Sequence, residues 1–96
     1  MVYNIQMNLT EEIIIPSTVF AQVVDDEMVL LDTKSENYFG LDAIGTVMWQ
    51  VLVEYHSLKK LKIMMLEKYD VEETILENDI KVFVSKLLEN KLITIG

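Results

Sequence analysis

The spacing of apolar residues changes near position 42, and this change restricts the chain to a small set of folds. Before it, the segments 19–24, 28–31 and 37–41 have the composition and length of β-strands. The polar breaks 25–27 and 32–35 separate them at hairpin spacing, which predicts an antiparallel meander. After it, the apolar period is helical. The order predicts an α+β domain, with a three-stranded antiparallel sheet followed by three helices, like a winged helix whose sheet comes first.

Each predicted helix has an apolar stripe and a capping signal. Asp42 is expected to cap the first helix and Ser57 the second. Thr74 and Glu77 form a T-x-x-E capping box for the third, and Asn90 is expected to end it in a left-handed conformation. The stripes are Ile44, Val47, Met48, Val51, Leu52 and Tyr55, then Leu58, Leu61, Met65, Leu66 and Tyr69, then Leu76, Ile80, Phe83, Val84 and Leu87.

The 96 residues suffice for one domain, which we place at residues 19–96 behind an N-terminal arm or extra strand at residues 1–18. Within that arm, a β-branched run at 13–15 stops at Pro16, as an edge strand or a covering arm would. An apolar tail of Leu92, Ile93 and Ile95 is expected to dock on the core. We see neither a secretory signal nor an apolar run of the ~18 residues that a membrane span needs.

The charge balance favours some partners over others. Sixteen acidic residues face eight lysines and no arginine, which gives a net charge of −8. This charge repels nucleic acid and anionic membranes, and it either attracts a basic peptide or simply keeps the domain in solution. The chain has no cysteine, which rules out disulfides and thiolate sites and agrees with a cytoplasmic location.

The residues offer no catalytic constellation. His56 is the sole histidine and falls where one helix should end, as a surface turn residue does. The acidic runs 25–27 and 72–73 lack the alternating ligands and central glycine of a calcium loop. The glycines are isolated, so no phosphate-binding loop is present. We therefore expect no enzyme activity, no metal and no cofactor.

Several short motifs together resemble the PqqD-like proteins. The front half of the resemblance is the segment 28–32, the sequence Asn-Tyr-Phe-Gly-Leu-Asp at 37–42, and then Gly45 and Trp49. The back half comprises Lys68-Tyr69-Asp70-Val71, Asp79-Ile80, Phe83-Val84, Leu87 and Leu92-Ile93. The resemblance covers about residues 19–95, and the front half is most similar to the stand-alone proteins of lasso-peptide biosynthesis. Lys91 departs from it, because the family often has glycine there.

The resemblance implies a RiPP recognition element, a domain that binds the leader segment of a ribosomally synthesised precursor peptide. In this family the leader adds as a strand to the third β-strand, beside the third helix. It is then delivered to a leader peptidase and a cyclase, or to another modifying enzyme.

Two features of the residues agree with this implication. The strand at 36–41 is the last of the meander, so one side of it should be an open edge suited to β-augmentation. On the third helix, four residues share the flank next to Phe83, where Val82 suits either a groove wall or an ordinary half-buried position. The expected peptide-binding residues are Glu36, Asn37, Tyr38, Phe39, Gly40, Leu41, Ile75, Asp79, Val82, Phe83 and Lys86.

Two alternatives remain open from the sequence. One is a winged-helix DNA-binding regulator, although the third helix is not basic. The other is a dimerising structural subunit in which the run 13–15 pairs across chains. For the leading hypothesis we expect a monomer or weak dimer that binds neither nucleic acid nor membranes.

Overall fold

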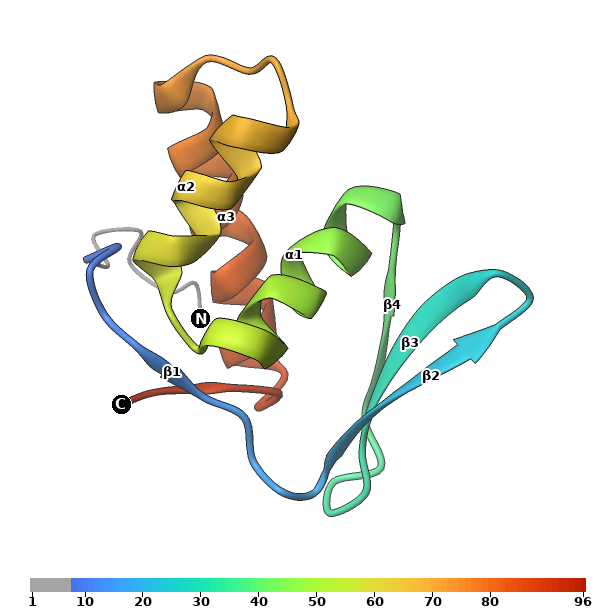
Figure 1. Ribbon diagram of the computed structural model, residues 1–96. Helices are drawn as coiled ribbons and strands as arrows, with labels where there is room; N and C mark the ends of the chain where they lie inside the picture. The colour runs from blue at the N-terminus through green and yellow to red at the C-terminus, as the bar shows by residue number, and fades with distance from the viewer. Residues whose placement is uncertain (1–7) are drawn as a thin grey trace.

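A computed structural model of the protein describes residues 8–96, and its elements follow the predicted order of sheet and then helices (Figure 1). This confirms the α+β class, with a three-stranded antiparallel sheet and three helices. Two short strands near the ends of the described chain add a second sheet. The elements are β1 Ile13–Ile14, β2 Val19–Val24, β3 Glu27–Asp32, β4 Tyr38–Leu41, α1 Ala43–Tyr55, α2 Leu58–Lys68, α3 Glu73–Glu89 and β5 Thr94–Ile95.

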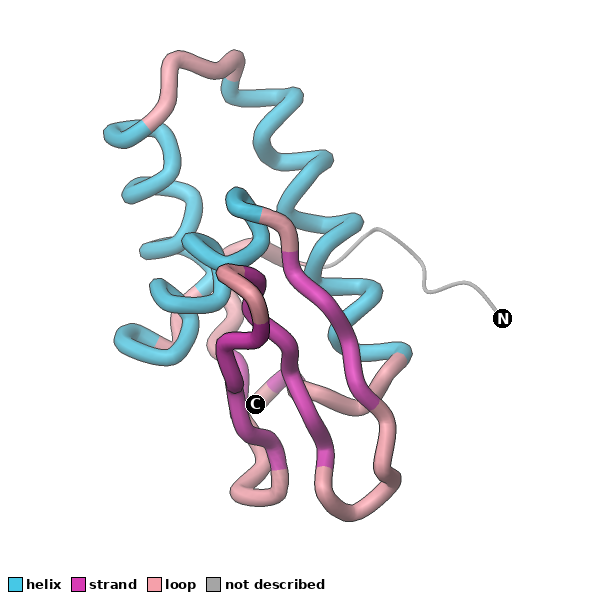
Figure 2. The backbone as a smooth tube through the Cα atoms, turned by 90° about the vertical axis from the view of Figure 1, so that its right-hand side faces the viewer, coloured by secondary structure: helices cyan, strands magenta, loops and turns pink. Residues whose placement is uncertain are grey.

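The main sheet has the order β2-β3-β4, so β3 is central and β4 lies at an edge. Leu30 of β3 is fully buried and stands opposite Ala21 and Phe39. Successive side chains of a strand point to opposite faces, so this row faces the helices and the row containing Leu31 faces away. Figure 2 shows the three strands side by side, with β4 on the side of α3.

Strands β2 and β3 are joined by the tight turn that the polar break predicts. Asp25 and Asp26 both have left-handed backbones, with φ of 52° and 66°. Two consecutive residues of this kind are the mark of a type I′ hairpin turn, whose twist matches that of the strands it joins. The hairpin is therefore short and its register is fixed.

The first two helices begin at the predicted caps. Asp42 Oδ1 accepts a hydrogen bond from the Gly45 amide at 2.7 Å, and Ser57 Oγ accepts one from the Lys60 amide at 3.1 Å. Each side chain thereby satisfies an amide that has no partner within its own helix. The capping prediction is confirmed for α1 and α2.

Both end signals predicted for α3 are wrong by one or two residues. The helix already begins at Glu73 with Glu72 as its N-cap, so Thr74 lies inside it and donates its hydroxyl hydrogen to Glu72 instead of capping. At the other end Asn90 has φ −90°, and the left-handed residue is Lys91 at φ 59°. The Leu92 amide then bonds Leu87 O, which closes a Schellman turn with lysine where glycine is usual.

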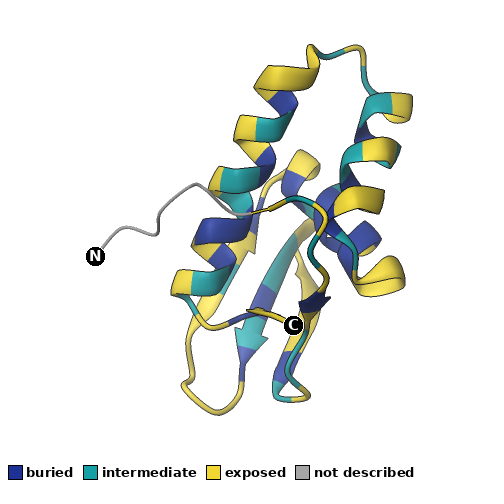
Figure 3. Ribbon diagram, turned by 90° about the vertical axis from the view of Figure 1, so that its left-hand side faces the viewer, coloured by how far each residue is buried: buried dark blue, intermediate teal, exposed yellow. Residues whose placement is uncertain are grey.

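The core lies between the helices and the inner face of the sheet, as the buried segments in Figure 3 show. Trp49, which the predicted stripe of its helix does not include, is only 3% exposed and belongs to the core. Ile44 and Tyr55, which were placed in that stripe, are exposed. Leu92 and Ile93 dock on the core as predicted, whereas Ile95 stays exposed. No helix within residues 8–96 is long and apolar enough to cross a membrane.

The run at 13–15 forms its strand within the chain. Ile13 and Ile14 of β1 pair antiparallel with β5. Next to this pairing, the Ile13 amide donates to His56 O at 3.0 Å, and the Leu58 amide donates to Glu11 O at 3.2 Å. Ile13 and Ile14 therefore already have backbone partners within the chain, which argues against a strand that pairs across chains. The domain division at residues 18 and 19 stays a prediction.

The turn between β3 and β4 is organised by one carboxylate. Asp32 is buried, and it accepts hydrogen bonds from the Ser35 hydroxyl at 2.7 Å and from the amides of Lys34 and Ser35. Hydrogen bonds from the hydroxyls of Ser35 and Thr18 lower the pKa of Asp32 from 3.8 to about 2. The ionised form of this side chain is the one that the fold stabilises.

The lowered pKa of Asp32 predicts how the stability of the fold changes as the pH falls. The carboxylate stabilises the fold above about pH 4, and this contribution disappears as the pH falls towards about 2. We expect Asp32→Asn to be less stable than the wild type near neutral pH but to lose less stability between those two pH values. Urea denaturation at several pH values in this range measures the slope of unfolding free energy against pH for each protein. Asp26→Asn, in the turn between β2 and β3, is the control. Parallel slopes for the wild type and Asp32→Asn would contradict the prediction.

Candidate peptide-binding groove

Strand β4 presents an open edge. It pairs with β3 on one side, and no strand of residues 8–96 pairs with its other side. The Asp32 amide donates to Asn37 O at 2.9 Å, so the carbonyl of Asn37 points towards β3. In an antiparallel strand the backbone groups of successive residues point to alternate sides. Phe39 therefore bonds towards β3, and Tyr38 and Gly40 direct their N–H and C=O groups to the open edge.

A groove runs beside this edge. It has a volume of about 330 Å³ and lies between β4, the first turns of α1 and one flank of α3. In Figure 2 the strand and the helix that form its two sides can be followed next to each other. The lining residues are Phe39, Gly40, Leu41, Asp42, Ile44, Gly45, Met48, Asp79, Val82, Phe83 and Lys86.

The structure brings most of the predicted site residues together in this groove. All of β4 from Phe39 onwards and all of the predicted α3 residues except Ile75 line it. Ile75 is 53% exposed on α3, outside the groove. Glu36 and Asn37 lead into β4 and Tyr38 begins it; all three are exposed and lie outside the groove lining, so they extend the edge beyond the groove.

Four residues at the start of α1 line the groove although none of them was predicted to bind the peptide, namely Asp42, Ile44, Gly45 and Met48. One signal was available in Gly45. A Cβ at this position would lie 3.1 Å from Asp42 Oδ1 and 3.4 Å from Phe83 Cε1. The tighter of these contacts is with the capping carboxylate, so the missing side chain of Gly45 leaves room for the Asp42 cap beside the Phe83 ring at the end of the groove.

The chemistry of the groove suits an apolar segment with some charge. Leu41 and Met48 are buried at its base, and Phe83 is half-buried. Val82 is 36% exposed on the wall between Asp79 and Lys86. Both ion pairs of residues 8–96 use Lys62, so Lys86 forms none within this range. Apolar side chains of a bound peptide would find contacts at the base, and polar groups would find partners at the rim.

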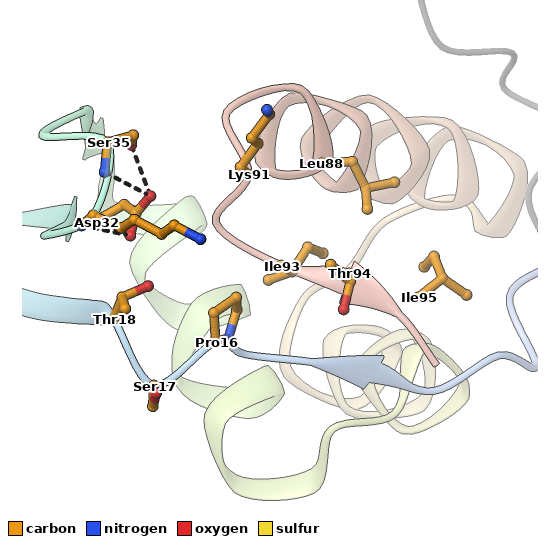
Figure 4. A pocket seen from close by; sticks show the side chains of 11 residues that line it. Pro16, Ser17, Thr18, Asp32, Ser35, Leu88, Lys91, Ile93, Thr94 and Ile95 are labelled. Carbon is orange, nitrogen blue, oxygen red and sulfur yellow. Dashed lines mark hydrogen bonds between the residues drawn. The ribbon is translucent and has the colours of Figure 1, made fainter.

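A larger hollow, of about 1030 Å³, lies elsewhere (Figure 4). It separates the chain before β2 and the β3–β4 turn from the chain that follows α3. In the close-up, Ser35 turns to Asp32 and hydrogen-bonds with it. The hollow contains no residue of β4, so it does not adjoin the open edge of that strand. Its lining is Pro16, Ser17, Thr18, Asp32, Lys34, Ser35, Leu88, Lys91, Ile93, Thr94 and Ile95.

Comparison with known protein families decides which family the chain represents. Residues 27–93 match the family described as Coenzyme PQQ synthesis protein D (PqqD). The chain belongs to the PqqD family. The matched span contains the β4 edge and every residue that lines the groove beside it. The resemblance inferred from the short motifs is therefore confirmed. A search of curated proteins gave no significant match.

Two solved structures are similar to this PqqD-family protein over most of its length. TbiB1 in complex with the TbiA(beta) leader peptide has a TM-score of 0.77 and 31% identity, over 83% of this chain and 93% of that chain. Lasso peptide synthetase B1 complexed with the leader peptide has a TM-score of 0.75 and 30% identity, over 85% of this chain and 96% of that chain. Both relatives are complexes with a leader peptide.

The burial of two aromatic residues predicts how each supports the fold. Trp49 is 3% exposed and lies outside the groove lining, so Trp49→Ala should cost about 3–5 kcal/mol of unfolding free energy. Phe83 is half-buried at the groove, so Phe83→Ala should cost clearly less than the ~3–5 kcal/mol of a fully buried phenylalanine. Urea denaturation of the two variants measures the difference. Equal losses would mean that Phe83 acts as a core residue.

Proposed function

We propose that this protein is a RiPP recognition element of the lasso-peptide type. It binds the leader segment of a ribosomally synthesised precursor peptide as an added strand on β4. It then delivers the peptide to a leader peptidase and a cyclase, or to another modifying enzyme, and it carries out no chemistry itself. The open edge of β4 beside an apolar helix flank is the observation that carries this proposal. Membership of the PqqD family and similarity to two leader-peptide complexes support it.

Affinity would come from the backbone and selectivity from alternate side chains. The N–H and C=O groups of Tyr38 and Gly40 are free to pair with an extended peptide. Each hydrogen bond made there would contribute about 0.5–1.5 kcal/mol. Peptide side chains on the inner face would enter the groove and contact the flank of α3 at Val82 and Phe83, because successive side chains of a strand point to opposite faces.

The charge of the protein adds a preference for basic leaders. Asp79 stands at the groove, Glu36 lies just before the edge strand, and the whole chain carries −8. A lysine or arginine near the apolar anchors of the leader would be attracted, and such an attraction weakens with salt. Lys86 provides one place at the rim for a carboxylate of the peptide.

The same charges argue against the DNA-binding alternative. Four carboxylates and three lysines lie within 73–91, on and just after α3, and the chain has no arginine. A recognition helix needs a basic surface to neutralise phosphates, and this one lacks it. We place the protein in the cytoplasm as a monomer or weak dimer, because ribosomally made precursors arise there and the chain has no cysteine to oxidise.

The direct test is an NMR titration of the ¹⁵N-labelled protein. The probes are the TbiA(beta) leader peptide and short peptides selected on this protein from a random phage-displayed library. We expect the largest amide shifts in Tyr38–Leu41 and along α3 from Asp79 to Lys86. Shifts confined to the hollow around Lys91 and Thr94, or no binding by either probe, would overturn the proposal.

Substitutions at Tyr38 separate backbone pairing from side-chain contact. Tyr38→Pro removes an N–H donor that faces the open edge, at the first residue of an edge strand, where proline is tolerated. Tyr38→Ala removes the ring but keeps the donor, so it is the matched control. We expect Tyr38→Pro to bind a labelled peptide about tenfold more weakly than Tyr38→Ala in fluorescence anisotropy. Equal affinities would argue against strand addition on β4.

A charge on the groove wall should block binding without unfolding the protein. Val82 is 36% exposed, so an aspartate there is solvated in the free protein and is desolvated only when the peptide covers it. We expect Val82→Asp to weaken peptide binding at least about tenfold, with a thermal midpoint close to that of the wild type. Val53→Asp on α1 is the matched control, because Val53 is 48% exposed and lies outside the groove. Equal binding by the two variants would place the peptide elsewhere.

A further inference from the structure

Gly40 occupies a strand position where the fold has no need of glycine. It is the third of the four residues of β4, and no glycine in the described chain has a positive φ. A Cβ built on Gly40 meets no atom within 4 Å. A side chain would fit there and would suit a strand better, because glycine weakens a strand interior. Glycine inside a strand often marks a place that another chain approaches.

The space beside Gly40 opens on the outer face of the sheet. In the register, Gly40 stands opposite Val29, and the neighbouring row joins Phe20, Leu31 and Tyr38. This row is apolar although Phe20 is 57% exposed and Tyr38 is 75% exposed. The opposite face, with Leu30, is the one that packs on the helices. The missing side chain of Gly40 therefore leaves an uncovered space next to Val29 and Tyr38 on this apolar face, and we call this space the recess.

The recess and the open edge lie side by side on the same strand. A peptide strand added to β4 would place the residue opposite Gly40 on the outer face, because directly opposed residues project to the same side. Its neighbours in the peptide, opposite Phe39 and Leu41, would project into the groove beside α3. The outer face of the sheet would therefore contact the peptide side chain opposite Gly40, which the groove cannot contact.

We propose that the outer face is a second specificity site, in which a large apolar side chain of the bound peptide, best an aromatic one, lies across Gly40 against Val29 and Tyr38. This inference rests on the proposed strand addition and deepens it by naming the peptide chemistry. A flat ring can cover a glycine on the neighbouring strand and recover the contact that the missing side chain would have made. The preferred ligand then has adjacent apolar residues, one facing α3 and the next facing the outer face.

The test fills the recess and asks whether the aromatic preference disappears. Short random peptides displayed on phage are selected separately on the wild type and on Gly40→Val. On the wild type we expect large apolar residues at adjacent positions of the enriched motif. On Gly40→Val we expect the outer position to lose its aromatic residues while the inner position keeps its preference. Gln22→Val is the matched control, because Gln22 belongs to the same outer row but lies on β2, away from the open edge.

A double-mutant cycle measures the coupling between Gly40 and the outer aromatic residue of the bound peptide. For a labelled wild-type binder, replacing the outer aromatic residue by alanine should weaken binding about three- to fivefold on the wild type and on Gln22→Val. On Gly40→Val the same replacement should have almost no effect. An equal loss on Gly40→Val would overturn the second site and leave strand addition standing. Failure of the wild type to enrich any peptide would overturn both.

Thermal melts test whether the fold itself requires glycine at position 40. Gly40→Val and the smaller Gly40→Ala should keep the thermal midpoint of the wild type or raise it, because the space is open and the backbone is not left-handed. If Gly40→Val alone melts early, the binding cycle is read on Gly40→Ala, which still places a methyl group in the recess. A clear loss of stability in both variants would show that the fold itself requires the glycine, and would overturn the inference.

Discussion

The carboxylate of Asp42 connects the two halves of the protein. It follows Leu41, the last residue of the edge strand, and caps α1 through the Gly45 amide. Because strand and helix meet without a loop, the direction of β4 sets the direction of α1. Gly45 leaves room for this carboxylate, and the Phe83 ring of α3 lies next to it. This junction sets two sides of the groove, the strand edge and the start of α1, and the flank of α3 completes it.

Much of this arrangement could be predicted from the sequence because it depends on short-range patterns of apolar and capping residues. The strands, the two caps at Asp42 and Ser57, and the exposed flank of α3 all depend on neighbours a few residues apart. The contribution of α1 to the groove could not be predicted in the same way. Whether Ile44 and Met48 face the core or the groove depends on how α1 crosses α3, and this is set by contacts distant in sequence.

The errors at the ends of α3 have local causes of a different kind. A threonine followed by a glutamate three residues later matches a capping box, but the chain was already helical at Glu73. Asparagine is a better left-handed residue than lysine, yet Lys91 takes that position. The reason is long-range: the turn at Lys91 is the one that brings Leu92 and Ile93 into the core, where both are buried. Burial of two large apolar side chains outweighs the local preference of one residue.

The left-handed residues of the protein have a consequence for its stability. Asp25, Asp26, Glu36, His56 and Lys91 all have positive φ, and each carries a side chain. Such a conformation costs roughly 1–2 kcal/mol for a residue with a Cβ, and glycine avoids that cost. The glycines within the strands and helices are instead Gly40 and Gly45, which do not have positive φ. The place of the side chain is empty at Gly40 and crowded by the Asp42 carboxylate at Gly45. The domain is therefore less stable than its fold permits, and glycine at some of these turn positions would raise the free energy of unfolding.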